Sequence, residues 1–446
     1  MQRSEFLKLS AAAVLLPCVA QAHAKVQSNH RTENNDVTND SWHYWNKKTR
    51  LTISMWDFTW LSDSGKGGSW ENLEQRVAEA AERGYNTLRV DCFPSRILEK
   101  ETSFRKGYQK AEGKFIPVWG RVTTDVTCNA LQKMKELADL CRKHDIFLGL
   151  ASWEKGHMMG QRNFHGLDTE NNPIPIHKEE KTLKDFAEVW VKALRLMREE
   201  GILERAAWVE PMNEVPHFCS QSLESIIQIS GRARQEGEVE LDKNQRLNER
   251  YKLINTWLGE ALKEEISRDG IPLCYSSIGA EEYAKCLPEF YDVVDVHFMP
   301  WVITNPEDNR EFAEIAKGNP QNFIGWERMD MKRWSEVWDR ACRNNYRQML
   351  IRCRDYHETA LQNCVFPSGK RMQAVITESF GPVFFPDHPD VSWEWYKHYN
   401  GDCARMVAAM PFEGISLSNF AEPLFSLWEH LDWHRNANLF IQNFKK

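Results

Sequence analysis

The stretch AAWVEPMNEVPHF, residues 206–218, begins as an apolar strand and ends in polar side chains: Glu210, Asn213 and Glu214 lie within five residues. Side chains alternate along a strand, so Glu210, Met212 and Glu214 share one face if the extended geometry continues. An unpaired charge is costly to bury. Carboxylates at the end of an apolar strand therefore indicate either an ionic partner or a function.

The rest of the chain repeats this change from apolar strand to amphipathic helix. Strands are expected within residues 50–61, 85–94, 146–154, 206–214, 272–279, 291–301, 372–382 and 412–425. Helical spacing follows in 72–84, 129–145, 182–201, 246–270, 335–363 and 392–410. Eight such units over about 400 residues favour an α/β fold, a single-domain (β/α)8 TIM barrel with extended βα loops, over a doubly wound sheet.

A barrel of this kind carries its functional residues at the C-terminal ends of its strands. Glu214 ends the fourth predicted strand, and Glu378 ends the seventh in AVITESFGP, residues 374–382. Alternation predicts that Ala374, Ile376 and Glu378 share one face. Two carboxylates at one barrel mouth suit glycosidic cleavage, in which one protonates the leaving oxygen and the other attacks the anomeric carbon.

Four strand-end segments resemble those of the cellulase-like, clan A glycoside hydrolases. VEPMNE at 209–214 is similar to the end of their fourth strand, and NTLRVD at 86–91 to their second. VVDVHFMPW at 293–301 resembles their sixth strand and VITESFG at 375–381 their seventh. The four segments occur in the order that the family requires and extend across the chain.

The resemblance implies roles for individual residues. Glu214 would be the acid/base and Glu378 the nucleophile. Asn213 would bind the sugar 2-hydroxyl, Arg89 would keep the nucleophile ionised, and His297 would line the site. Glu210 corresponds to a structural acid of the family.

Three positions depart from the family pattern. Met299 stands where the family has a tyrosine, and the eighth strand ends in Asn419 and Phe420 instead of a tryptophan. Ser379 is inserted between Glu378 and the Phe-Gly pair that normally follows the nucleophile. These departures leave the substrate class open.

Other strand-end residues are candidates for supporting or substrate contacts: Trp56, Trp60, Trp153, Glu154 and Trp301. Of Trp56 and Trp60, core packing is expected for one and a sugar platform for the other, because flat aromatic faces suit both. A structural partner such as Asp91 or Glu210 is the alternative for Arg89, since a buried arginine needs an anion. His297 has a simple structural role as its alternative.

Composition limits the partners of this chain. Its 446 residues carry a net charge of −7 without a basic cluster, which argues against nucleic acid. The eleven cysteines include no CxxC pair, and no HxH or HExxH spacing is present. We therefore expect a carbohydrate substrate, no cofactor and no resident metal. The sequence leaves the oligomeric state open.

The first residues have the features of a targeting segment. Residues 1–24 combine Arg3 and Lys8 with an apolar run and end in Ala-His-Ala, which predicts a signal peptide too short for a permanent membrane span. A polar leader at 25–45 and the barrel domain at 46–446 follow. Export to a periplasmic or extracellular location is expected; lipid anchoring at Cys18 is the alternative.

Three functions are consistent with these residues. The first is a retaining glycoside hydrolase that cleaves O-glycosidic bonds in a polysaccharide or oligosaccharide by two-glutamate double displacement. The second is a carbohydrate-binding barrel with weak or no catalysis, suggested by Met299 and the missing tryptophan. The third is a metal-dependent barrel enzyme that uses Glu154, Glu210 and His297 as ligands.

Overall fold

The core of the protein is a sheet of eight parallel strands. The computed structural model describes residues 49–105, 122–154, 176–214, 243–277, 279, 282–299, 306–315, 330–382, 385 and 387–444. The strands are β1 (Leu51–Trp56), β2 (Thr87–Asp91), β5 (Phe147–Ala151), β6 (Ala206–Val209), β7 (Cys274–Ser277), β8 (Val293–Val296), β9 (Gln373–Ile376) and β10 (Gly414–Ser416). Each lies within one of the eight segments predicted from the sequence, so the strand prediction is confirmed.

The sheet closes into a barrel. Its strand order is β6-β5-β2-β1-β10-β9-β8-β7, with the registered pairs running parallel. The two outer strands of this order approach each other through a parallel bridge between Val209 and Leu273. The Val209 N–H also donates to the Pro272 carbonyl at 3.0 Å. The predicted (β/α)8 TIM barrel is therefore confirmed.

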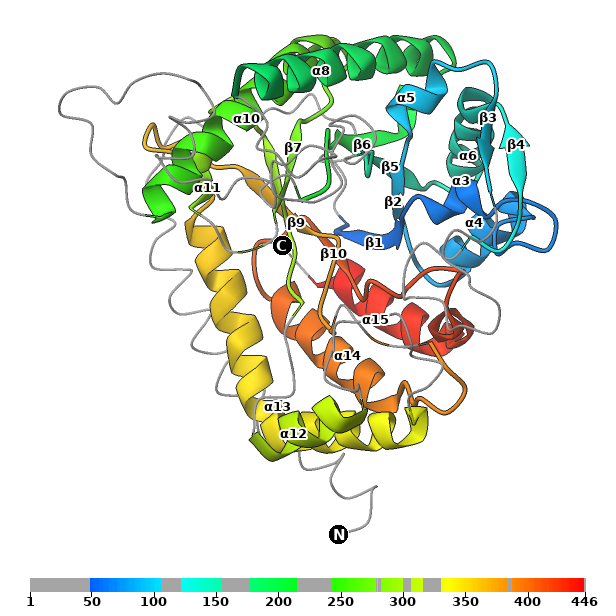
Figure 1. Cartoon of the computed structure of the whole chain (residues 1–446), viewed down its shortest axis with the longest axis vertical. Helices are drawn as coiled ribbons and strands as arrows, with labels where there is room; N and C mark the ends of the chain where they lie inside the picture. Colours follow the sequence, from blue (N-terminus) through cyan, green and yellow to red (C-terminus); the bar gives the residue numbers. More distant parts are fainter. Residues whose placement is uncertain are drawn as a thin grey trace.

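Helices surround the strands (Figure 1). The longer ones are α4 (Leu73–Glu82), α6 (Ala130–Lys143), α8 (Ile176–Glu199), α10 (Lys243–Ile266), α12 (Pro306–Ile315), α13 (Met331–Gln362), α14 (Glu394–Ala408) and α15 (Leu431–Asn443). Short helices are α3 (Thr59–Ser62), α5 (Pro94–Ile97) and α11 (Tyr283–Cys286), with 3-10 turns η1 (Ile202–Arg205), η3 (Ser267–Asp269) and η5 (Ser426–Glu429). Helix α12 and the antiparallel hairpin of β3 (Thr102–Phe104) and β4 (Val126–Cys128) were not predicted.

Polar side chains fix where three of the helices begin. Asn72, Asn129 and Asp330 precede α4, α6 and α13, and each accepts a hydrogen bond from the backbone N–H three residues later. Such caps satisfy N–H groups that have no partner within the helix. They account for the abrupt change from loop to helix after polar residues in the sequence.

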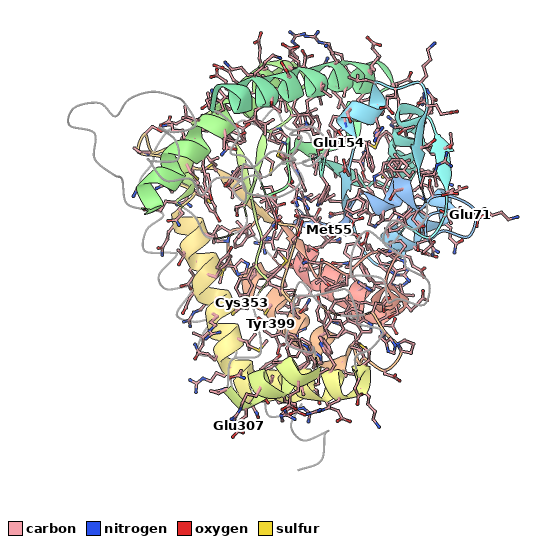
Figure 2. The ribbon with its side chains drawn as sticks, in the orientation of Figure 1. Met55, Glu71, Glu154, Glu307, Cys353 and Tyr399 are labelled. Atoms are coloured by element: carbon pink, nitrogen blue, oxygen red, sulfur yellow. The ribbon has the colours of Figure 1, made fainter. Side chains whose placement is uncertain are left out.

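The barrel interior has an apolar layer, called the lower layer here, which lies below the C-terminal ends of the strands. Its buried side chains form one cluster: Leu51, Ile53, Phe147, Ala207, Trp208, Cys274, Val293 and Val375. Trp208 fills the space over Gly149, where an added Cβ would lie 2.3 Å from the indole ring. Figure 2 shows Met55 of β1 in the interior and Glu71 and Glu307 at the periphery. A packed lower layer leaves the C-terminal end of the barrel for polar side chains.

Several predictions concern residues beyond the described ranges. The signal peptide, the polar leader and Cys18 all fall in residues 1–48, and Trp301 lies in another such segment. The nine cysteines of the described segments are free thiols. Among the described residues, no helix combines the length and the apolar character needed to cross a bilayer.

Candidate active site

The end of β6 carries Glu210 inward and then turns. The strand ends at Val209, the Glu210 N–H donates to the Leu150 carbonyl at 2.7 Å, and the Asn213 N–H donates to the Ser152 carbonyl at 2.8 Å. Met212 packs in the outer core, the larger apolar cluster that is separate from the one inside the barrel. Glu214 has a positive φ of 51°. The predicted alternation of Glu210, Met212 and Glu214 on one face is therefore wrong, because the chain leaves extended geometry after Val209.

Glu378 reaches the interior by a similar departure at the end of β9. Val375 faces the barrel interior, whereas Ala374 and Ile376 pack in the outer core. Beyond Ile376 the strand ends, and the Glu378 carbonyl accepts a hydrogen bond from the Phe298 N–H at 3.1 Å. The predicted shared face of Ala374, Ile376 and Glu378 is thus also wrong. Both glutamates are brought to the mouth by the chain after the strand, not by strand alternation.

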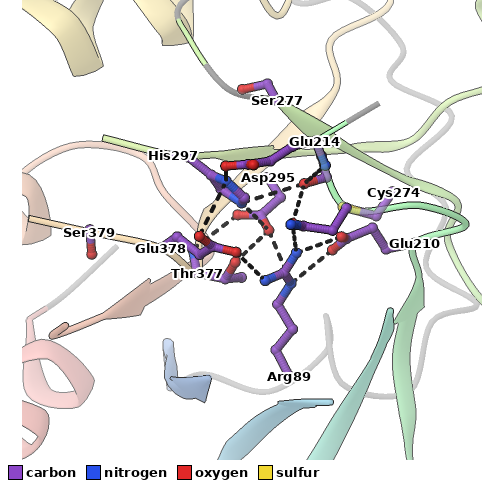
Figure 3. Close-up of polar contacts among 12 residues, drawn as sticks. Arg89, Glu210, Glu214, Cys274, Ser277, Asp295, His297, Thr377, Glu378 and Ser379 are labelled. Carbon is purple, nitrogen blue, oxygen red and sulfur yellow. Dashed lines mark hydrogen bonds and ion pairs between the residues drawn. The ribbon is translucent and has the colours of Figure 1, made fainter. Parts of the chain in front are cut away.

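Arg89 lies at the centre of the site (Figure 3). It is fully buried on β2. Its Nε and Nη2 donate to the two oxygens of Glu210 at 3.0 and 2.6 Å. Its Nη1 donates to Glu378 Oε1 at 2.9 Å, and Nη2 also donates to Asn213 Oδ1 at 2.6 Å. Both partners weighed for Arg89 from the sequence, the nucleophile candidate and a structural acid, are therefore present.

The surroundings keep Arg89 charged. Burial opposes its charge, but Glu210, Asp295 and Glu378 outweigh burial and raise the pKa of Arg89 well above its ordinary value. The guanidinium also lies over the Trp153 ring, 4.4 Å from its centroid. The guanidinium thus places a buried positive charge against Glu378.

His297 joins the two candidate catalytic carboxylates. Its Nδ1 lies 2.9 Å from Glu214 Oε1 and 3.8 Å from Glu378 Oε2, and its Nε2 lies 3.2 Å from Asp295 Oδ2. Burial opposes protonation, but the charges of Glu378 and Asp295 raise the pKa of His297 well above its ordinary value. The two acids thus favour the protonated form of the ring, in which both nitrogens donate.

Glu214 and Glu378 lie close together at the mouth of the barrel. A carboxylate oxygen of each and a nitrogen of His297 all lie within 4.8 Å of one another. The Glu214 side chain is 15% exposed and that of Glu378 only 6%. Glu378 is thus the more enclosed carboxylate and contacts Arg89, whereas Glu214 is the one more open to solvent.

The tryptophans predicted after β1 are in the core. Trp56 is fully buried and packs edge-on against Trp70, with ring centroids 6.0 Å apart. Trp60 is 1% exposed, and its Nε1 donates to the Asp91 carbonyl at 2.7 Å. Core packing was expected for one of the two tryptophans, and both are buried in the core. Neither therefore presents an exposed ring face to a sugar in this structure.

Glu154 has a role in holding a loop. Its carboxylate accepts hydrogen bonds from the backbone N–H and the hydroxyl of Ser95, the second residue of the helical turn α5. Among the described residues, the group of acidic and histidine side chains close enough to hold one metal ion is Glu214, His297 and Glu378. The ligand set of the metal hypothesis, Glu154, Glu210 and His297, is therefore not brought together.

The departures from the family pattern contact one another. Asn419, after β10, donates from Nδ2 to Met299 Sδ at 3.0 Å, and its Oδ1 accepts a hydrogen bond from the Ser379 N–H at 2.5 Å. The Asn419 N–H in turn donates to the Ser379 carbonyl at 3.0 Å. The three unusual residues thus form one contact set beside Glu378.

Sequence reasoning missed three polar residues of the site. Asp295 contacts both Arg89 and His297, Ser276 contacts Asn213, and Asp57 follows β1. Asp295 had a signal: it precedes His297 by two residues in a strand, so alternation places both on one face. Ser276 had none, because a serine in a strand is common.

An eight-stranded barrel with two glutamates at the mouth is the architecture of barrel glycoside hydrolases. Comparison with known proteins agrees with this class. Residues 53–442 match the family described as sugar-binding cellulase-like, and the chain belongs to that family. No curated protein matches the chain at a significant level.

Solved structures are similar to this chain to different degrees. A candidate glycoside hydrolase from Parabacteroides distasonis is 21% identical, with a TM-score of 0.64 over 89% of this chain and 94% of that one. A family 5 xyloglucan-specific endo-β-1,4-glucanase from a metagenomic library is 15% identical, with a TM-score of 0.43 over 87% and 96% of the two chains. A family 5 mannosidase from Rhizomucor miehei is 11% identical, with a TM-score of 0.42 over 88% and 94%.

Proposed function

We propose that the protein is a retaining glycoside hydrolase in which Glu378 is the nucleophile and Glu214 is the acid/base. The observation that carries this proposal is the proximity of the two carboxylates, whose oxygens lie within 4.8 Å. Retaining enzymes hold their carboxyl groups about 5–5.5 Å apart, whereas inverting enzymes hold them about 6.5–9.5 Å apart to admit a water molecule. The 4.8 Å limit joins the nearest oxygen of each carboxylate, and so close an approach is compatible with the retaining arrangement.

The contacts of each carboxylate support the assignment of roles. Glu378 accepts a hydrogen bond from Arg89, and a nucleophile must be ionised when the sugar arrives. Glu214 contacts His297 and is the more exposed of the two. Exposure suits the acid/base, because it must reach the leaving oxygen first and a water molecule second.

The reaction then has two steps. The Glu378 carboxylate attacks the anomeric carbon and forms a glycosyl ester, while Glu214 gives its proton to the departing oxygen. Glu214 next takes a proton from water, which attacks the same carbon and releases Glu378. Asn213 contacts a substrate hydroxyl in this scheme, and its hydrogen bond from Arg89 to Oδ1 supports that role by orienting the amide.

A binding barrel without turnover is not favoured. It would not need two neighbouring carboxylates, one held by a buried arginine and the other by a buried histidine. Met299 and the loss of the tryptophan after the eighth strand suggested that alternative. Asn419, which stands there instead, contacts Met299 beside Glu378, and both glutamates remain in place.

Sugar release from a panel of aryl glycosides and polysaccharides tests the proposal. Wild type should release sugar from at least one substrate, and Glu378→Gln should not. Glu214→Gln should lose about 10²–10⁴-fold in rate, the usual contribution of a general acid. Glu71→Gln, an exposed carboxylate on the periphery, is the matched control and should match wild type. Equal rates for Glu378→Gln and wild type would reject the assignment.

A further inference from the structure

The backbone of Glu214 adopts an unfavourable conformation. Its φ of 51° lies in the left-handed region, which residues other than glycine rarely adopt. Such conformations persist where surrounding contacts fix them, and they concentrate at functional sites. One contact that holds this backbone is with Ser276 on β7: the Glu214 N–H donates to Ser276 Oγ at 3.0 Å.

The same hydroxyl also holds Asn213. Ser276 Oγ donates to Asn213 Oδ1 at 3.2 Å, and Arg89 Nη2 donates to that oxygen at 2.6 Å. With two donors facing Oδ1, the amide has one orientation, and its NH2 group lies on the other side. One hydroxyl therefore accepts from Glu214 and donates to Asn213, which are adjacent in sequence.

Ser276 is inside the barrel because of its place in the strand. Cys274 belongs to the interior cluster and Tyr275 to the outer core, so alternation directs Ser276 inward and Ser277 outward. Ser277 Oγ donates to the Gly279 carbonyl at 3.0 Å, and Figure 3 shows Ser277 apart from the polar cluster. The two serines are equally buried but face opposite sides of the strand.

We propose that Ser276 is a positioning residue, which sets both the backbone of Glu214 and the amide of Asn213 for reaction. This inference rests on the proposed function of Glu214 as acid/base. Ser276 acts through its two partners and has no contact of its own with the reacting atoms. His297 Nε2 lies 3.4 Å from its Oγ, so the hydroxyl also borders the histidine ring that contacts Glu214.

The inference predicts a defect in proton donation. In Ser276→Ala the Glu214 N–H loses its acceptor and the Asn213 amide loses a donor, so the acid/base moves from its place. Loss of one such contact should lower kcat about 10–100-fold with little change in KM, because small misplacements of catalytic groups are costly. The defect should shrink for an aryl glycoside whose leaving group departs without protonation.

Ser277→Ala is the matched control, since it removes a buried hydroxyl from the neighbouring position. Both variants and wild type are assayed on two aryl glycosides of the same sugar, one with a poor and one with a good leaving group. A larger defect for Ser276→Ala on the poor leaving group supports the inference. Equal losses in the two variants, or equal losses on the two substrates, would overturn it.

A crystal structure of Ser276→Ala separates this inference from the proposed function. The inference expects Glu214 to leave its left-handed conformation or the Asn213 amide to turn. If both residues keep their wild-type geometry, Ser276 does not position them, even when the enzyme is active. If wild type releases no sugar while the geometry of Ser276→Ala changes as expected, the proposed function is at fault.

Discussion

Arg89 is the residue on which the charges of the site depend. It contacts Glu210, Glu378 and Asp295 while fully buried, and removal of such a cation would leave carboxylates without compensation. Although burial opposes ionisation of Asp295, His297 and Arg89 hold the pKa of that carboxyl below its ordinary value. The site therefore places the buried Arg89 and His297 among several acids. Of the two catalytic candidates, Glu214 is the one more open to solvent.

Asp57 is buried, and among the described residues no cation forms an ion pair with it. It follows β1, and its Oδ1 accepts hydrogen bonds from the N–H and hydroxyl of Thr59 at 2.7 and 2.5 Å. Burial, with a further contribution from the charge of Glu378, raises the pKa of Asp57 to about 6. In the unfolded chain the pKa of an aspartate is about 3.9. The folded state therefore binds the proton more tightly, and Asp57 costs stability as the pH rises from about 4 to about 6.

Replacement of Asp57 by asparagine should remove this pH dependence. The amide keeps an acceptor for Thr59 but never ionises. The unfolding free energy of Asp57→Asn minus that of wild type should be about 3 kcal/mol larger at about pH 7.5 than at about pH 4. Each unit of pKa difference between the folded and unfolded states corresponds to about 1.4 kcal/mol. Urea unfolding of both proteins at the two pH values measures the change.

The control for this experiment is an exposed acid on α6. Lys135 lowers the pKa of Asp139, so Asp139→Asn should change stability with pH in the opposite direction and only slightly. If Asp57→Asn shows the same difference from wild type at both pH values, Asp57 is not protonated preferentially in the folded state.

Strands and helices use glycine for different reasons. Gly149 lies in β5, where an added Cβ would meet Trp208 ring atoms at 2.3 Å, 2.5 Å and 2.9 Å. Gly401 lies within α14, where the nearest atom to an added Cβ is on the Arg405 guanidinium, 3.5 Å away. The first glycine makes room for the indole inside the barrel. The second has no such packing requirement.

Alanine at these two positions should act in opposite directions. Gly149→Ala overpacks the barrel interior and should lower the unfolding free energy by at least about 1–3 kcal/mol. Gly401→Ala replaces a helical glycine without a clash and should gain about 0.5–1 kcal/mol. Chemical denaturation of each variant gives both values. Similar effects in the two variants would show that Trp208 is not held as described.

The elements also show what the sequence could and could not predict. Apolar runs located all eight strands, and Gly84 and Gly201 ended helical runs where the structure has left-handed turns. Alternation failed after Val209 and Ile376, because periodicity applies only while the chain stays extended. The hairpin of β3 and β4 was missed since its strands are three residues long, too short to show a pattern.

At the scale of the whole molecule, the site depends on contacts between strands distant in sequence. Arg89, Glu210 and Glu378 come from β2 and from the ends of β6 and β9, and the barrel brings them within hydrogen-bond distance. These residues could be proposed from the sequence because of its resemblance to the cellulase-like family. The match over residues 53–442 confirms that family. Ser276 and Asp57 could not be found in this way, because their roles follow only from the closed barrel.

The central claim is that the barrel cleaves glycosidic bonds by double displacement through Glu378. Proton NMR of the reaction with the best substrate of the panel tests it most directly, because it reports the anomeric configuration of the first product before mutarotation. Two displacements at one carbon predict that this product has the configuration of the substrate. A product of inverted configuration would contradict the account, since it would require direct attack by water without a glycosyl-Glu378 intermediate.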